Sequence, residues 1–245
     1  MNAFRIIGDI FHLVSILWLL VKLIKTRSCG GISGKTQLLF ALVFSTRYLD
    51  LFSGYISTYN TAFKITYIVC SYVTVLLILV VFQKSYRSTE DSFLTEIILL
   101  PTFVLALYAN NIMEPVEILW AFSIYLESVA ILPQFYMIYK KGELERSLLY
   151  YLIPLGLYRL FYIFNWIYRY NTEGHIDKIS DGAGIIYVIV YLLALLEFCT
   201  GKVKVTDEEN GKFLKKNIFF ISSNEPFTVN GEKTLSSEQL IDGNV

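Results

Sequence analysis

The sequence predicts an all-α membrane protein with seven transmembrane helices, and two observations favour this class. Hydrophobic residues make up 55% of the 245-residue chain and charged residues only 17%, against roughly 25% charged residues in an ordinary soluble domain. Apolar runs of about 20 residues, the length that a helix needs to cross a bilayer, recur along most of the chain. Short connections with Gly, Ser, Asn or charged residues separate these runs.

The runs divide the chain into one membrane domain and a tail. The predicted spans cover residues about 4–24, 36–54, 62–82, 94–110, 115–138, 148–169 and 181–200. The first run is a retained span, because it contains Arg5, Asp9 and His12 and lacks the clean apolar core of a signal peptide. Residues 1–202 then form the transmembrane domain. Residues 203–245 are polar, a composition that predicts a largely disordered tail.

Lys and Arg gather in alternate connections, which predicts the orientation of the chain. The connections after the first, third and fifth predicted spans are basic, and so is the start of the tail. The connections on the opposite side are poor in Lys and Arg. We therefore expect a lumenal or extracellular amino terminus, a cytosolic tail, and membrane lipid around the spans.

The second and sixth predicted spans share a weak internal sequence similarity. Each follows a basic, Gly-containing connection, and each carries an Arg beside a Tyr: Arg47-Tyr48 in one and Tyr158-Arg159 in the other. Duplicated halves with a ligand site between them recur in transporters. This similarity favours a 3+1+3 arrangement of the spans.

Several function classes are disfavoured by composition and motifs. The net charge is +0, so nucleic acid is not an expected partner. Cys29, Cys70 and Cys199 are far apart, which disfavours a metal site or a disulfide framework. The chain has no nucleotide-binding loop and no catalytic triad. We expect neither an enzyme nor a cofactor.

Charged side chains within the predicted spans indicate a polar cavity, because ionisable groups at membrane depth normally face a cavity or a partner. The fifth span carries Glu117 and Glu127 but neither Lys nor Arg before residue 138, so it must face positive groups. The candidate partners are arginines in or at the edges of other spans: Arg5, Arg47, Arg159 and Arg169.

Helical spacing places some of these charges on shared faces, with a structural and a functional interpretation of each. Arg5, Asp9 and His12 lie at offsets of four and three on one face. Arg5 and Asp9 either pair at the water interface or face the cavity, and His12 either packs or acts in function. Arg47 and Asp50 can form an internal ion pair, and Arg47 can present its guanidinium to a ligand carboxylate. Both interpretations hold if Asp50 positions Arg47.

Aromatic and polar residues of the fifth and sixth spans leave similar alternatives. Trp120 is either an interfacial residue or an aromatic wall against a cation. A narrow polar stripe, flanked by Trp166, either joins helices or lines a pocket. The stripe has offsets of four, seven and eleven: Tyr158, Tyr162, Asn165 and Arg169. Together these groups suit a zwitterionic ligand such as a peptide or an amino acid.

Long motifs, in order along the chain, carry a resemblance. They are residues 1–12, Gly31-Ile-Ser-Gly-Lys-Thr-Gln37, Leu42-Val-Phe-Ser-Thr-Arg-Tyr-Leu-Asp-Leu51, Leu126-Glu-Ser-Val-Ala-Ile-Leu-Pro-Gln134 and Gly156-Leu-Tyr-Arg-Leu-Phe-Tyr162. They closely resemble the KDEL receptors, the endoplasmic-reticulum (ER) lumenal protein-retaining receptors, over about residues 1–190. The resemblance implies a seven-helix fold similar to the SWEET and PQ-loop transporters.

The resemblance also implies a function. Members of this family bind the carboxy-terminal tetrapeptide of escaped ER proteins, Lys-Asp-Glu-Leu or His-Asp-Glu-Leu, in the acidic cis-Golgi. They return this cargo to the ER with the COPI coat and release it at neutral pH, and the COPII coat is a further expected partner. A multi-pass location in the ER and cis-Golgi membranes follows. The alternative is a transporter of the same fold for a small polar or zwitterionic solute.

Roles carried over by position follow from the same resemblance. Arg5, Arg47 and Arg169 would receive the carboxylates of the signal, and Tyr162 would hold the terminal one with Arg47. Glu117 and Trp120 would take the basic first residue of the signal. The residues that shape and support the cavity would be Tyr48, Asp50, Glu127, Tyr158, Arg159, Asn165 and Trp166.

The resemblance implies a pH switch at His12, supported by Glu127. An unperturbed histidine titrates near ~6.5, so a slightly acidic compartment can charge it. If binding takes up this proton, affinity falls as pH rises. Lys202 and Lys204 would engage the coat, or they reflect only the positive-inside rule.

The sequence departs from the family in the last span and the tail. The usual helix-seven pattern has Gln-Thr and then Tyr-Cys-Asp-Phe-Phe, but here Leu193 holds the place of the aspartate. Glu197 lies one turn later. A long polar tail follows Lys202-Val-Lys204 in place of a short lysine-rich end. We expect intact ligand binding and an altered coupling of binding to retrieval.

Overall fold

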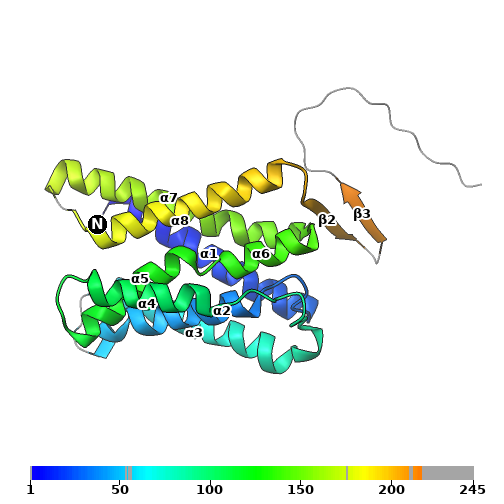
Figure 1. Cartoon of the computed structure of the whole chain (residues 1–245), viewed down its shortest axis with the longest axis horizontal. Coiled ribbons are helices and arrows are strands. Elements are labelled where there is room, and N and C mark those ends of the chain that lie inside the picture. Colours follow the sequence, from blue (N-terminus) through cyan, green and yellow to red (C-terminus); the bar gives the residue numbers. More distant parts are fainter. Residues whose placement is uncertain (1, 53, 55–56, 175, 210–211, 217–245) are drawn as a thin grey trace, which may run out of the picture.

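The computed structural model describes residues 2–52, 54, 57–174, 176–209 and 212–216. This part of the chain is a bundle of helices that run along one long axis, with a small sheet at one end (Figure 1). The amino terminus lies at the end of the bundle opposite the sheet (Figure 1). One end of the bundle therefore carries the sheet, and the other carries the amino terminus of the chain.

The helices follow the predicted spans in order. Their bounds are α1 Ala3–Thr26, α2 Gly34–Arg47, α3 Thr58–Leu76, α4 Glu96–Tyr108, α5 Pro115–Val129, α6 Leu132–Lys141, α7 Arg146–Glu173 and α8 Lys178–Cys199. The pair α5 and α6 together occupies the fifth predicted span. A 3₁₀ turn, η1 (Leu49–Phe52), follows α2, and a π turn, η2 (Leu77–Val81), extends α3. A second 3₁₀ turn, η3 (Gln83–Ser85), follows.

Local sequence explains where several helices begin and end. The side chains of Asn2, Ser33 and Ser57 each accept a hydrogen bond from a backbone N–H in the first turn of the helix that follows. Gly142 and Gly174 adopt positive φ angles of 67° and 63° directly after α6 and α7. Such caps satisfy backbone groups that the helix itself leaves unpaired.

The break between α5 and α6 has a proline at its origin. Pro133 lies in the first turn of α6 and has no N–H to donate to the preceding turn. The chain turns at Ala130 and Ile131, and the N–H of Gln134 binds both the Ile131 carbonyl and the Thr36 hydroxyl. The predicted single span over residues 115–138 is therefore two helices.

Two of the predicted spans are shorter than expected. Within the described residues, five helical segments are long and apolar enough to cross a membrane: Ala3–Thr26, Thr58–Val81, Pro115–Lys141, Arg146–Glu173 and Lys178–Cys199. Helix α2 has 14 residues and α4 has 13, against about 20 for a full crossing. The prediction that the second span is helical from residue 36 to 54 is wrong at its end, because α2 stops at Arg47.

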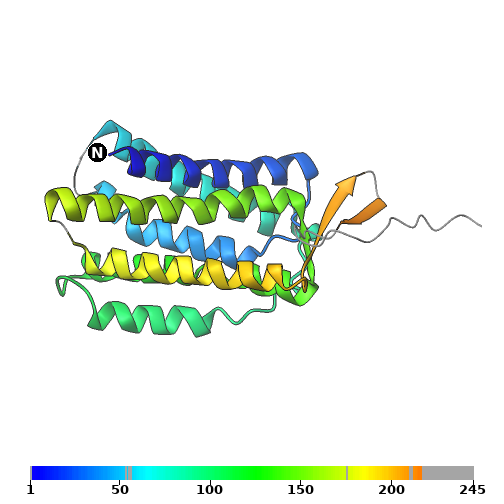
Figure 2. The same ribbon diagram turned by 90° about the horizontal axis from the view of Figure 1, so that it is seen from above.

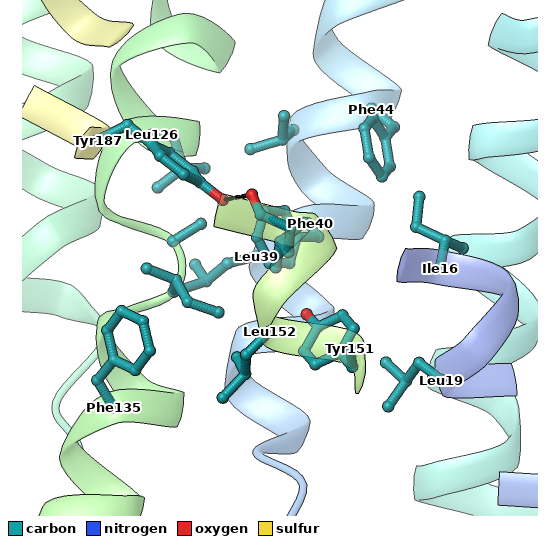
Figure 3. Packing of buried hydrophobic residues seen from close by; sticks show 14 of the residues in the cluster. Ile16, Leu19, Leu39, Phe40, Phe44, Leu126, Phe135, Tyr151, Leu152 and Tyr187 are labelled. Atoms are coloured by element: carbon teal, nitrogen blue, oxygen red, sulfur yellow. Dashed lines mark hydrogen bonds between the residues drawn. The ribbon is translucent and has the colours of Figure 1, made fainter. Parts of the chain in front are cut away.

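The helices pack in a pattern that links the two halves of the chain. Helix α3 contacts both α1 and α2, and α8 contacts both α5 and α7. Helix α1 packs along α7 and α2 along α5, while α4 lies at the edge of the bundle against α5 (Figure 2). The buried apolar core lies between these helices, with Leu19 of α1, Phe44 of α2, Leu126 of α5 and Tyr151 of α7 among its members (Figure 3).

The predicted tail begins with ordered structure. Strand β1 (Glu143–Glu145) pairs in parallel with β2 (Lys204–Glu209), and β2 pairs antiparallel with β3 (Lys212–Lys216). Val203 and Val205 alternate with polar residues at the start of the tail, and both are buried, as is Leu144 of β1. This alternation is typical of a strand with one buried face. The prediction of disorder is wrong for residues 203–209. Residues 217–245 lie outside the described part of the chain.

Gly184 in α8 provides a test of this packing. A Cβ atom at this position would collide with the Trp166 ring, whereas a Cβ at Gly182 would meet no atom within 4 Å. Gly184→Ala is expected to destabilise the protein by about 1–3 kcal/mol through overpacking. Gly182→Ala is expected to be neutral or stabilising, because Ala favours the helix by about 1 kcal/mol. Thermal unfolding in detergent measures both, and equal melting temperatures would contradict the contact.

Candidate functional site

A polar cleft lies at the end of the bundle where α1 begins. Its inner cavity has a volume of about 390 Å³ and its outer cavity about 740 Å³. The two share the lining residues Arg5, Tyr162, Trp166 and Ser180, and therefore form one continuous cleft. The outer cavity is lined by the first residues of α1, the last turns of α7 and the start of α8.

The charge cluster at the inner cavity is built around Glu127 of α5, which is 1% exposed. Arg47 of α2 donates to its Oε2 at 2.7 Å, Tyr158 of α7 donates to its Oε1 at 2.9 Å, and Arg159 of α7 forms a second ion pair with Oε2. Two arginines thus share one carboxylate. The cluster keeps a net positive charge beside the cleft.

Arg47 is oriented by α5 and not by Asp50. Its Nε and Nη2 atoms donate to the hydroxyl and the carbonyl of Ser123 at 3.1 and 2.9 Å. Asp50 forms an ion pair with Lys64 of α3. The predicted pairing of Arg47 with Asp50 is therefore wrong. The short helix α2 ends between the two residues, so the three-residue spacing does not place them on one helix face.

Arg159 supports Glu127 from an aromatic enclosure. Its guanidinium lies 5.0 Å from the ring centroids of both Tyr158 and Tyr187, and the residue is 5% exposed. Cation–π contacts of this kind stabilise a cation away from water. Arg159 therefore reaches the inner cavity mainly through the carboxylate that it holds.

Arg5 and Asp9 on α1 do not pair with each other. Asp9 accepts hydrogen bonds from Tyr59 of α3, at 2.8 Å, and from Tyr162 of α7. Within the described residues, the Arg5 guanidinium makes no hydrogen bond and no ion pair. Arg5 lines both cavities, so its guanidinium is available to a ligand in the cleft, although the carboxylates of Asp9 and Asp177 also line these cavities.

His12 lies deeper in the bundle, within an aromatic stack. Its ring is stacked on Tyr158 with centroids 4.2 Å apart and an interplanar angle of 11°, and Tyr67 lies 4.7 Å away. The residue is 6% exposed and also lines the inner cavity. Its Nε2 atom is buried without a hydrogen-bond partner in the described part of the chain. Tyr158 thus contacts His12 with its ring and Glu127 with its hydroxyl.

The outer cavity contains the far end of the polar stripe on α7. Arg169 pairs with Glu173 at 2.8 Å in an exposed position. Asn165 is buried, and Trp166 packs over Gly184. The stripe runs from the buried Tyr158 to the exposed Arg169, and it follows the wall of the cleft as the lining interpretation expects.

The structure brings most of the predicted site residues together. Those that line the cleft are Arg5, His12, Arg47, Tyr48, Asp50, Trp120, Glu127, Tyr158, Arg159, Tyr162, Asn165, Trp166 and Arg169. Glu117 lines neither cavity, and its carboxylate accepts a hydrogen bond from Asn111 at 2.8 Å. Lys202 and Lys204 lie at the other end of the bundle, beside the sheet.

Sequence reasoning missed several lining residues on α3. Tyr59, Lys64 and Tyr67 all face the inner cavity. Lys64 is an ionisable residue within a predicted span, and this was a usable signal for a cavity residue. Tyr59 and Tyr67 carried no such signal, because tyrosine is frequent throughout this chain, with 18 copies.

A multi-helix membrane bundle with a charged cleft at one end defines an integral membrane protein that binds a small charged ligand. Residues 28–169 match the model of the ER lumen protein retaining receptor family. Over 191 residues, 78% of this chain, the sequence is 56% identical to ER lumen protein-retaining receptor 3 of Xenopus tropicalis and covers 89% of that protein. Over the same length it is 54% identical to ER lumen protein-retaining receptor 2 of Gallus gallus and of Mus musculus, with 90% of each covered. The chain belongs to the ER lumen protein retaining receptor family of multi-pass membrane proteins.

The charge cluster predicts how the bundle responds to loss of Glu127. Glu127→Gln leaves Arg47 and Arg159 buried without a counter-ion, so we expect a destabilisation of about 3–5 kcal/mol. Glu173→Gln, which alters the exposed pair with Arg169, is the matched control and should change stability by less than about 1 kcal/mol. Thermal unfolding of the two purified variants decides this. Equal losses of stability in both variants would contradict the central role of the cluster.

Proposed function

We propose that this protein is a retrieval receptor that binds the carboxy-terminal Lys-Asp-Glu-Leu or His-Asp-Glu-Leu signal of soluble ER proteins. The observation that carries this proposal is the Arg5 guanidinium, which makes no ion pair within the described residues, in a cleft whose inner end holds two arginines on one carboxylate. A signal of this kind brings three carboxylates: the chain terminus and the Glu and Asp side chains. Membership of the retaining-receptor family supports the same ligand.

The positions of the cations suggest how the peptide lies. An extended tetrapeptide is about 13–14 Å long, and arginines occur along the whole cleft. Arg169 lines the outer cavity, Arg5 lines both, and Arg47 lines the inner cavity. The chain terminus would enter first and end at Arg47, where the guanidinium already forms a charge-assisted contact with Glu127. Tyr162 would join it after release from Asp9.

Trp120 would form the wall that receives the basic first residue of the signal. It lines the inner cavity, where its ring is available to a Lys or His side chain. Glu117 lies three residues earlier on α5, and so on the neighbouring turn of the same face. A change of the Glu117 rotamer away from Asn111 would bring its carboxylate to the basic side chain of the signal.

His12 and Glu127 would make binding depend on pH. The ring of His12 is stacked on Tyr158, whose hydroxyl binds Glu127, and Glu127 in turn holds Arg47. A ligand carboxylate at Arg47 adds negative charge to this chain of contacts and favours the charged histidine. Binding then takes up a proton, so affinity is high in acid and falls as the pH rises. Capture in the acidic Golgi and release in the neutral ER require this direction of the pH dependence of affinity.

The two ends of the bundle would face different compartments. Basic residues lie beside the sheet: Lys22 pairs with Glu145 of β1, Lys141 ends α6, and Lys202 precedes β2. By the positive-inside rule this end would face the cytosol. The cleft and the amino terminus would then face the lumen of the cis-Golgi and the ER. Lys202 and Lys204 would meet the COPI coat on the cytosolic side.

The packing supports the 3+1+3 arrangement. The two halves correspond if α1 is matched with α5, α2 with α7 and α3 with α8. In the first half α3 contacts both α1 and α2, and in the second half α8 contacts both α5 and α7. The same matching turns the contact of α1 with α7 into the contact of α5 with α2, and both contacts are present. Helix α4 would be the linker. The transporter alternative shares this arrangement but is not favoured by the relatives, whose names are those of receptors.

The first test of the receptor measures binding of a labelled peptide that ends in Lys-Asp-Glu-Leu to the purified full chain at pH 5.5. Amidation of the peptide terminus removes one of its carboxylates and should weaken binding by about 10²-fold, the loss expected for a charge-assisted contact of about 1.5–3 kcal/mol. Arg5→Gln should weaken binding similarly. Arg87→Gln, at an exposed site in the turn region after η3, should leave binding unchanged. Equal binding of the acid and amide peptides would refute the proposal.

A second test addresses the pH response. Peptide affinity of the parent chain should fall from pH 5.5 to 7.4, by about tenfold for each unit of difference between the bound and free pKa of the responding group. His12→Phe keeps an aromatic ring against Tyr158 and should flatten this profile. Tyr59→Phe, which also lines the cleft, should keep the profile while it alters the affinity. An unchanged profile in His12→Phe would exclude this histidine as the switch.

A further inference from the structure

A second, very small cavity lies next to His12, apart from the cleft. It has a volume of about 20 Å³, and among the described residues His12 alone lines both this cavity and the inner cavity of the cleft. The other polar lining residues are Gln37, Ser71, Thr74 and Tyr151, and the rest of its wall is apolar. A buried cavity needs roughly 10–15 Å³ of this kind of volume to hold one water molecule. The space therefore suits a single water and excludes a larger ligand.

Its hydroxyl groups are arranged as hydrogen-bond acceptors. Ser71 donates its hydroxyl proton to the Ile68 carbonyl at 2.8 Å, and Thr74 donates to the Cys70 carbonyl at 2.8 Å. Both protons are used within α3, so the oxygen lone pairs remain for a further donor. A water molecule has two protons to give, and these two side chains can take both.

His12, whose side chain lines this small cavity, also has an unsatisfied ring nitrogen. Its Nε2 is buried and without a hydrogen-bond partner in the described part of the chain, and such groups are rare in native proteins without an ordered water. Gln37 makes no hydrogen bond with His12, and its amide nitrogen donates to the Tyr151 hydroxyl at 3.1 Å.

The charged and titratable groups around His12 also leave its proton without a direct acceptor. Glu127 of α5 already accepts from Arg47 of α2 and from Arg159 and Tyr158 of α7. Asp9 of the same helix accepts from Tyr59 and Tyr162. Tyr67 of α3 donates its hydroxyl to the Asp9 carbonyl. These acceptors are therefore engaged with other donors, and none of them makes a hydrogen bond with His12 in the described part of the chain.

We propose that one structural water occupies this cavity, donates hydrogen bonds to Ser71 and Thr74, and accepts a hydrogen bond from the charged imidazole of His12. Ser71 and Thr74 are then positioning residues for the pH response. They act through the water and do not touch the peptide. This part of the inference rests on the proposed function, whereas the presence of the water does not.

A structure of the full chain at high resolution tests the site directly. The expected result is a density peak in the cavity within hydrogen-bond distance of the Ser71 and Thr74 hydroxyl oxygens. An empty cavity in such a structure would overturn the proposal, whether or not the protein binds peptide.

The functional arm uses Ser71→Ala and Thr74→Val, singly and together, with a labelled peptide that ends in Lys-Asp-Glu-Leu. Loss of the water removes a hydrogen bond from the charged imidazole, so the pH midpoint of binding should shift by about one unit toward acid, with little change in affinity at the most acidic pH. Thr66→Val is the matched control, because Thr66 makes the same bond to its own helix, to Ala62 at 2.8 Å, but lies away from the cavity.

The outcomes separate the two proposals. A shift in the Ser71 and Thr74 variants, absent in Thr66→Val, supports the water site. An unshifted midpoint with normal peptide binding refutes the role of the water but leaves the receptor intact. Absence of peptide binding by the parent chain at every pH refutes the proposed function, and the density in the cavity then decides the water site alone.

Discussion

The whole structure depends on one buried carboxylate that two arginines share. Glu127 on α5 binds Arg47 on α2 and Arg159 on α7, so a single side chain joins three helices from both halves of the sequence. A charge at membrane depth is tolerated only with such partners. Because two cations meet one anion, the cluster also carries a surplus positive charge, and this surplus lies beside the cleft. The same contacts therefore hold the bundle together and make its cavity attractive to anions.

Tyr158 connects this cluster to the histidine. Its hydroxyl binds Glu127, and its ring stacks on His12 with a separation of 4.2 Å. A change of charge on the imidazole and the proposed ligand at Arg47 would thus act on the same small group of atoms. This proximity gives a physical basis for linkage between a proton and an anionic ligand, because each alters the electrostatic environment of the other.

The opposite end of the bundle contains the segments that the sequence indicates as departures from the family pattern. Leu193 is 58% exposed on α8, and Glu197 pairs with Lys202 at 3.0 Å outside the core. Strand β2 follows directly and attaches the chain after α8 to β1, with Val205 buried beside Leu144. These contacts join the end of α8 to the small sheet, and a leucine, not an acidic residue, stands at position 193.

The sequence by itself determined the membrane class, the order of the helices and most of the charged residues that line the inner cavity. Ionisable residues are so unfavourable in apolar spans that each one, such as Arg5 or Glu127, indicates a cavity or a charged partner. It did not determine which charges meet, since Arg47 pairs with Glu127, 80 residues away, and not with the neighbouring Asp50. That choice depends on where α2 ends and how α5 crosses it. Only the tertiary structure decided these pairings, because the separation of two side chains on different helices is a property of their packing and not of local spacing.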